Sequence, residues 1–152
     1  MSTFEPDPPQ AVDGIRVGIG GWTFAPWRGL FYPSGLVQRR ELEYASRQLS
    51  AIEINGTYYR AQKPATYARW RDETPDGFVF SAKAPKRITA ARNLAKGAGA
   101  IADFVGGIAE LGSKLGPIVW QFEKGRTIDA DDFSAFLQHL PPAAGDMKLR
   151  HV

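Results

Sequence analysis

Ionisable and amide side chains recur on one face of three predicted strands. Glu53 and Asn55 interrupt the apolar run A-I-E-I-N, Lys83 ends F-V-F-S-A-K, and Gln121 lies in P-I-V-W-Q-F. Side chains of a β-strand alternate between its two faces, so Glu53 and Asn55 lie together, opposite the isoleucines. Lys83 and Gln121 lie on the polar side of their strands in the same way. We therefore expect one apolar face and one face that becomes polar toward the carboxyl ends of the strands.

The expected chemistry is that of an acid–base pair supported by amides. If Glu53, Lys83 and Gln121 lie on adjacent strands at similar depth, a carboxylate, an ammonium group and an amide come within contact distance. Burial pushes each charged group toward its neutral form, whereas pairing holds both ionised. A glutamate or lysine in that setting serves as a general acid or base, and a lysine also forms Schiff bases. The alternative is a structural ion pair that only fixes the strand register.

Further candidates for substrate binding lie in the loops after the first two strands. Trp22 follows G-I-G-G, where two glycines permit a sharp turn or a close approach of a ligand. It is either a wall of the pocket or an aromatic side chain that packs the loop. After the second strand, Tyr58 offers a stacking surface and Arg60 a clamp for a phosphate or carboxylate. Together with Asn55 and Gln121, these residues form the predicted substrate-binding set.

The segment from Lys83 to Lys96 carries five cations and no acid. Lys86 and Arg87 follow the predicted strand end, and we expect them to bind an anion; the alternative is a solvated loop. The net charge of +3 does not by itself indicate a nucleic-acid-binding protein. An anionic small molecule is the expected partner, with nucleic acid as an alternative.

Metal and cofactor sites have little support in the residues present. Cysteine is absent, which excludes disulfides and thiolate ligands, and His139 and His151 belong to no recognisable zinc motif. The chain also has no P-loop, and G-I-G-G-W lacks the third glycine of a dinucleotide-binding fingerprint. We expect no metal, and no cofactor is indicated. Because there is no secretory signal and no apolar run of ~20 residues, we expect a cytoplasmic protein without membrane contact.

Short apolar runs bounded by turn residues predict strands at Ile15–Gly20, Ala51–Asn55, Phe78–Lys83 and Pro117–Phe122, and a fifth strand starting at Met147. Helical spacing of apolar residues is seen in Leu42, Ala45 and Leu49, and in Ile101, Phe104, Ile108 and Leu111. Another helix begins at Pro64, and the last follows the N-cap Asp129, with the buried stripe Phe133, Phe136, Leu137 and Leu140. Strands that alternate with helices predict a parallel α/β sheet with right-handed crossovers.

Two architectures fit this order of elements. Residues 1–14 are rich in proline and acids and predict a flexible tail, while residues 15–152 predict one domain. Length favours an open doubly wound sheet, because a complete (β/α)8 barrel needs roughly 250 residues. Strand polarity favours a barrel, because strands covered on both faces are apolar throughout and barrel active sites collect at the C-terminal strand ends.

Four motifs, G-G-W, E-I-N-G-T-Y-Y-R, F-S-A-K-A-P-K-R-I-T and L-G-P-I-V-W-Q-F, resemble in this order the YecE-like family, known as domain of unknown function 72. The form W-x-x-x-x-W-R-G-x-F-Y-P, from Trp22 to Pro33, adds to the resemblance, which runs from about Ile15 to the end of the chain. The family implies a TIM-type barrel considerably longer than this sequence. The resemblance therefore implies that residues 15–152 are the N-terminal part of one barrel, with about four βα units and the start of a fifth strand.

The residues and the resemblance leave three functional hypotheses. The first is a barrel-type enzyme, of hydrolase, lyase or isomerase type, that acts on an anionic, phosphorylated or nucleotide-like small substrate through Glu53 and Lys83. The second is a non-catalytic module that binds nucleic acid or another polyanion. The third is an inactive truncated barrel, whose open edge strands are covered by self-association or by the missing C-terminal half.

Overall fold

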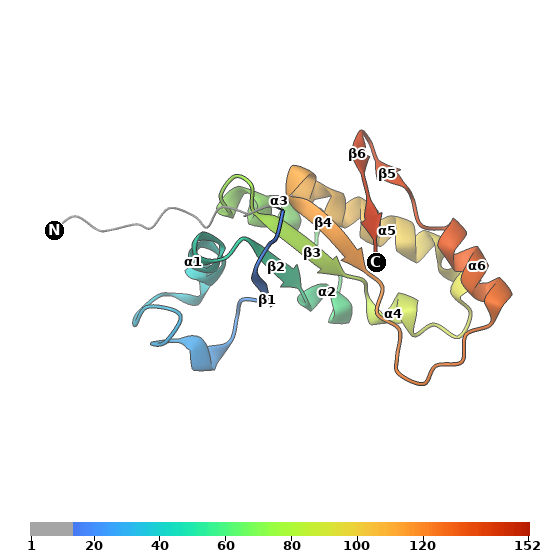
Figure 1. The fold of residues 1–152 in the computed structure, drawn as a ribbon, viewed down its shortest axis with the longest axis horizontal. Coiled ribbons are helices and arrows are strands. Elements are labelled where there is room, and N and C mark those ends of the chain that lie inside the picture. The colour runs from blue at the N-terminus through green and yellow to red at the C-terminus, as the bar shows by residue number, and fades with distance from the viewer. Residues whose placement is uncertain (1–13) are drawn as a thin grey trace.

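The computed structural model describes residues 14–152, so the tail predicted at residues 1–14 lies outside the described residues except for Gly14. Parallel strands form a five-stranded sheet in the order β1-β2-β3-β4-β7 (Figure 1). The strands are β1 (Gly18–Gly20), β2 (Ala51–Ile54), β3 (Val79–Lys83), β4 (Leu115–Val119) and β7 (Arg150–His151). The predicted α/β fold with a parallel sheet is confirmed.

Helices connect the strands. The longer ones are α1 (Glu41–Gln48), α3 (Pro64–Glu73), α5 (Ala98–Ile108) and α6 (Ala130–Gln138). Short helices are α2 (Gly56–Tyr59), α4 (Lys86–Thr89), η1 (Ala25–Trp27), η2 (Gln38–Arg40), η3 (Leu94–Gly97) and η4 (Ala109–Lys114), and a hairpin joins β5 (Ala143–Ala144) to β6 (Met147–Lys148). Figure 1 shows α2 and α4 directly beyond the arrowheads of β2 and β3. Both short helices therefore lie at the end of the sheet where the polar residues were predicted.

The core lies on one face of the sheet, beneath the longer helices. Its central strand residues are at most 1% exposed: Ile52, Ile54, Phe80, Ala82 and Ile118. The residues that alternate with them in β2 and β3 are only partly buried. Apolar side chains on one face thus hold the helices, and the other face stays open. This is the division that the alternation of residue types predicted.

Several boundaries differ from the prediction. β1 begins at Gly18 instead of Ile15, and β4 spans Leu115–Val119 instead of Pro117–Phe122. The prediction of one continuous strand from Met147 was wrong. Gly145 takes a φ of 57°, which turns the chain, so that β6 pairs antiparallel with β5 and only β7 joins the main sheet.

The last helix is fixed at its start by two aspartates. Asp129 is the predicted N-cap, and its Oδ1 accepts the backbone N–H of Asp132 at 2.9 Å. The carboxylate of Asp132 accepts the N–H groups of Ala95 at 2.8 Å and Leu94 at 2.9 Å, which ties α6 to η3. These hydrogen bonds hold the pKa of Asp132 below its ordinary value. Leu137, which was predicted to belong to the buried stripe, is 49% exposed. Each residue of an α-helix is rotated by about 100° from the one before it, so the side chain after the buried Phe136 points away from the core.

The loop after β1 is anchored by an ion pair at the start of α1. Arg28 Nε donates to Glu41 Oε1 at 2.8 Å, and the Glu41 side chain is fully buried. Nearby, the buried Tyr32 donates its hydroxyl proton to the backbone carbonyl of Trp22. Burial, with a smaller contribution from the Glu41 charge, raises the pKa of Tyr32 to about 12. The W-R-G-x-F-Y-P motif therefore builds the loop.

Among the helices of residues 14–152, none has both the length and the apolar character that a membrane span requires.

Candidate functional site

Glu53 and Lys83 form an ion pair at the C-terminal ends of β2 and β3. Lys83 Nζ lies 3.1 Å from Glu53 Oε1, and the side chains are 19% and 28% exposed, respectively. Glu53 is opposite Ser81 in the strand register, so Lys83 lies two residues further along β3 on the same face of the sheet. This is the separation of a direct contact between the ammonium nitrogen and the carboxylate oxygen. The sequence alternation predicted this contact from the residue types alone.

A cavity of about 310 Å³ opens beside Lys83. Its lining residues are Asn55, Tyr58, Tyr59, Lys83 and Gln121. The Lys83 ammonium lies 5.9 Å from the centre of the Tyr58 ring, a cation–π contact, and the Tyr58 and Tyr59 rings meet edge to face at 5.3 Å. The cavity therefore combines one cation, two amides and two aromatic rings. Tyr59 is the member that sequence reasoning left out; its position next to Tyr58 was the available signal.

A buried threonine fixes the ends of β2 and β3 relative to each other. The hydroxyl of Thr57 lies 2.7 Å from the Ile54 carbonyl oxygen and 2.6 Å from the Lys83 carbonyl oxygen. Since one hydroxyl proton serves both acceptors, the two carbonyls are held close together. Thr57 lies in α2. At the start of this helix the Tyr58 N–H donates a hydrogen bond to the Asn55 carbonyl oxygen, 3.0 Å away. This short helix, which was not predicted, orients the aromatic wall of the cavity.

Because Gly20 has no side chain, the Asn55 side chain can occupy the space beside it. A Cβ atom at Gly20 would lie 2.6 Å from Asn55 Nδ2, which is inside the contact distance of real side chains. The next residue, Gly21, has a φ of 77° and donates its N–H to the Glu53 carbonyl at 2.8 Å. The glycine pair therefore turns the chain and admits an amide of the site, which explains its position at the end of β1.

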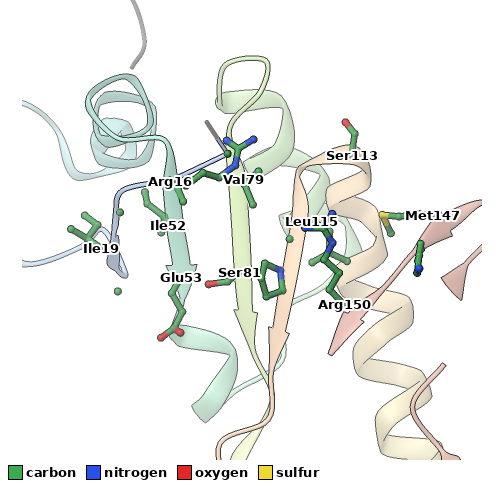
Figure 2. A pocket seen from close by; sticks show the side chains of 17 residues that line it. Arg16, Ile19, Ile52, Glu53, Val79, Ser81, Ser113, Leu115, Met147 and Arg150 are labelled. Carbon is green, nitrogen blue, oxygen red and sulfur yellow. The ribbon is translucent and has the colours of Figure 1, made fainter. Parts of the chain in front are cut away.

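A larger hollow of about 850 Å³ follows the polar face of the sheet. Figure 2 shows Glu53, Ser81 and Arg150 at a similar level across this face, with Arg16 nearer the start of the strands. Glu53 lines the larger hollow and Lys83 lines the smaller cavity. The ion pair thus lies between the two spaces.

Two predicted binding residues lie away from the cavity. Trp22 packs edge to face against Trp70, with ring centres 4.9 Å apart, and contacts Phe80 at 6.5 Å. These contacts place its ring against the apolar core, as in the packing alternative. Arg60 is exposed after α2 and lines neither space. The site that the structure brings together is therefore smaller than the predicted set.

Lys86 is paired with a carboxylate. Its Nζ lies 2.8 Å from Glu123 Oε1, and this hydrogen bond raises the pKa of Lys86 and lowers that of Glu123. Arg126 ties the same loop to the end of α4, with guanidinium hydrogen bonds of 2.9 Å to the Thr89 carbonyl and 2.6 Å to the Ala91 carbonyl. Lys86 therefore contributes to loop anchoring.

Arg87, the second predicted anion ligand, is exposed and lines neither of the two spaces.

The histidines contact neighbouring groups of the fold. His139 Nε2 lies 2.6 Å from the Ala95 carbonyl oxygen, and His151 lies between the Trp120 indole N–H, 3.1 Å away, and the Pro141 carbonyl oxygen, 2.7 Å away. Within the part of the chain that the structure describes, no three His, Cys, Asp or Glu side chains are grouped so that they could hold a metal ion.

The fold and the site define an α/β protein with a parallel sheet, whose polar groups gather at the C-terminal ends of the strands. The sequence model of the family described as "Protein of unknown function DUF72" matches residues 16–151. The chain belongs to the DUF72 family, as the resemblance of its motifs predicted.

Known relatives cover the chain in sequence and in structure. The UPF0759 protein YecE of Escherichia coli K12 is 28% identical over 102 residues, which is 67% of this chain and 35% of that protein. A DUF72 family crystal structure from Thermotoga maritima has a TM-score of 0.67 at 20% identity, over 90% of this chain and 54% of that one. A second, from Enterococcus faecalis, has a TM-score of 0.66 at 19% identity, over 90% and 49%. The chain thus shares the fold of the two solved proteins and spans about half the length of each, while its match to YecE covers 35% of that protein.

Proposed function

We propose that this chain provides the catalytic strand ends of an enzyme that acts on an anionic small molecule, phosphorylated or nucleotide-like, and that its sheet is the first half of a TIM-type barrel. The parallel strands, the open polar face and the match to half of longer DUF72 structures support the barrel. The polar groups at the C-terminal strand ends are where barrel enzymes hold their catalytic residues.

The observation that carries the proposal is the ion pair of Glu53 and Lys83 beside the 310 Å³ cavity. Lys83 is the cation among the residues that line this cavity, so an anionic group enters next to its ammonium. The anion then replaces Glu53 as the counter-ion of Lys83. Glu53, released from the pair, accepts a proton from the substrate as the general base and returns it as the general acid.

The remaining lining residues bind and orient the substrate. Asn55 and Gln121 offer amide donors and acceptors on two sides of Lys83, and Tyr58 supplies an aromatic wall. A flat ring, such as a nucleobase, stacks on such a wall with little dependence on its identity. The arrangement serves hydrolysis, elimination and isomerisation alike, because each needs one proton transfer next to a stabilised negative charge.

The anion-binding step is tested by NMR titration of the ¹⁵N-labelled protein with inorganic phosphate and with adenosine monophosphate. We expect shifts in the backbone amides around Asn55, Tyr58 and Lys83, and loss of binding in Lys83→Met. Lys86→Met is the matched control, because it removes the same charge from a lysine that is also paired with a glutamate, Glu123, but does not line the cavity. Equal weakening in both variants, or unchanged binding in Lys83→Met, would contradict the proposed site.

A polyanion-binding surface is the second candidate. Arg87 and Arg92 are both exposed and make no ion pair within residues 14–152, which leaves their charges available to phosphates. Phosphate contacts make the logarithm of affinity fall steeply with the logarithm of salt concentration. Binding of single-stranded DNA that is salt-dependent, is lost in an Arg87→Ala/Arg92→Ala variant and survives Glu53→Gln would favour this function.

A further inference from the structure

A second lysine–glutamate pair, Lys86 with Glu123, lies in the connections that follow β3 and β4. Lys86 begins α4 three residues after Lys83, and Glu123 follows Gln121 by two residues. An extended chain spans at most roughly 3.6 Å per residue, so the Cα atom of Lys86 lies within ~11 Å of that of Lys83. By the same measure Glu123 lies within ~7 Å of Gln121. Since Lys83 and Gln121 line the 310 Å³ cavity, the second pair belongs to its surroundings.

Tyr58 lies near the side chains of both lysines. The Lys83 ammonium is 5.9 Å from the centre of the Tyr58 ring. The hydrogen bond to Glu123 raises the pKa of Lys86, and the charges of Tyr58 and Tyr59 add to this effect. Water and salt screen charges at longer range, so groups that shift a pKa in this way lie close by. Because Tyr59 is 85% exposed, Lys86 lies at the outer rim of the cavity.

The two ion pairs differ in their exposure to solvent. The side chains of Lys83 and Glu53 are 19% and 28% exposed. Those of Lys86 and Glu123 are 53% and 52% exposed. Exposed ion pairs contribute little to stability, and a displaced Glu123 carboxylate is hydrated where it stands. An anion at the rim therefore replaces Glu123 as the partner of Lys86 at little cost.

We propose that the two lysines bind a diphosphate group, with one phosphate on Lys83 in the cavity and the second on Lys86 at the rim. This inference rests on the proposed function and specifies its substrate class. A lysine ammonium is a point charge with three donors on a flexible stem, so it follows a phosphate without a fixed geometry. When a monophosphate is bound, Lys86 keeps Glu123 as its partner. Only a diphosphate engages both lysines.

Calorimetric titration with inorganic phosphate and with pyrophosphate tests this inference. We expect the wild-type protein to bind pyrophosphate about tenfold more tightly than phosphate, the effect of one added charge-assisted hydrogen bond. Lys86→Met should weaken pyrophosphate binding about tenfold and phosphate binding less than about twofold. Lys96→Met is the matched control, because it removes the same charge from an exposed lysine of η3 that lines neither space. It should leave the preference for pyrophosphate intact.

A substitution of the glutamate separates ligand binding from loop anchoring. Lys86→Met and Glu123→Gln break the same ion pair, so a purely structural role of the pair predicts the same change in both. A diphosphate site predicts opposite changes. Glu123→Gln should strengthen pyrophosphate binding about threefold, because the phosphate no longer competes with a carboxylate for Lys86. Circular dichroism verifies that each variant is folded.

Adenosine diphosphate distinguishes two sources of the diphosphate. If it binds more tightly than pyrophosphate and loses this gain in Tyr58→Leu, the diphosphate belongs to a nucleotide that stacks on Tyr58. If the two ligands bind equally, the site takes the diphosphate group alone. Both results support the inference, provided that binding weakens in Lys86→Met.

Three results would overturn the inference: pyrophosphate binding no tighter than phosphate binding, equal losses in Lys86→Met and Lys96→Met, or weaker pyrophosphate binding in both Lys86→Met and Glu123→Gln. If phosphate binding depends on Lys83 but pyrophosphate binding does not depend on Lys86, the inference fails and the proposed function stands. If phosphate binding is absent or does not depend on Lys83, both fail.

Discussion

Two glycines in β1, Gly18 and Gly20, allow matched alanine substitutions that we expect to affect different properties. The first should lower the stability of the fold, and the second should weaken ligand binding. A Cβ atom at Gly18 would lie 2.1 Å from the Ala51 carbonyl oxygen and 2.7 Å from its carbonyl carbon. Those atoms belong to the backbone of the neighbouring strand, so Gly18→Ala must push β1 and β2 apart. At Gly20 the clash is with Asn55 Nδ2 at 2.6 Å, the far end of a side chain that can rotate away. Gly20→Ala should therefore keep the fold and displace the amide.

The expected magnitudes follow from these contacts. Overpacking of a rigid site costs about 1–3 kcal/mol, and a backbone clash places Gly18→Ala at about 3 kcal/mol. A loss of 1 kcal/mol lowers the melting temperature of a domain of this size by roughly 2–4 °C, so a decrease of ~6–12 °C is expected. Gly20→Ala should cost less than ~1 kcal/mol, yet weaken adenosine monophosphate binding about fivefold through the lost Asn55 hydrogen bond.

Urea unfolding followed by circular dichroism measures the stability of the two variants, and NMR titration measures their binding. The two variants add the same methyl group at positions that are two residues apart in one strand, so each is the control for the other. Equal losses of stability in both, or a Gly18→Ala protein as stable as the wild type, would refute the reasoning from strand contact.

The remaining predictions concern anchoring groups away from the cavity. Because the N–H groups of Ala95 and Leu94 hold the pKa of Asp132 below its ordinary value, this carboxylate stabilises the fold at neutral pH and loses its effect as the pH falls through its folded pKa. Asp132→Asn should lower the melting temperature at pH 7, and the difference from the wild type should shrink toward acid pH. Arg28→Met leaves the buried Glu41 carboxylate without its partner and should cost about 3 kcal/mol in urea unfolding. The double variant with Glu41→Gln should recover part of that loss, and an additive loss would contradict the pairing.

The sheet and the central ion pair were predictable because both depend on strand periodicity. The alternation of Ile52 and Ile54 with Glu53 determines which face is buried, and parallel neighbouring strands bring Lys83 to the same face. Asp129 was predictable as an N-cap because its role depends on residues only three positions away. Local patterns of this kind are visible in one sequence.

Contacts between loops were not predictable. Lys86 and Glu123 are 37 residues apart and belong to different strand–helix connections, so no spacing rule brings them together. Trp22 follows a glycine turn, but its packing on Trp70 depends on where α3 lies in three dimensions. The hairpin that precedes β7 depends on a single glycine turn, which a strand-like run of residues conceals.

The most direct test of the proposed site is the turnover of a panel of phosphorylated small molecules and nucleotides by the wild-type protein and by Glu53→Gln, followed by NMR of the products. General acid–base catalysis contributes about 10²–10⁴ in rate, so Glu53→Gln should lose at least ~100-fold in turnover. Its phosphate binding should stay within about threefold and its melting temperature within a few degrees of the wild type. Turnover by Glu53→Gln at the wild-type rate, or the absence of any turnover by the wild-type protein, would contradict the assignment of Glu53 and Lys83 as a catalytic pair.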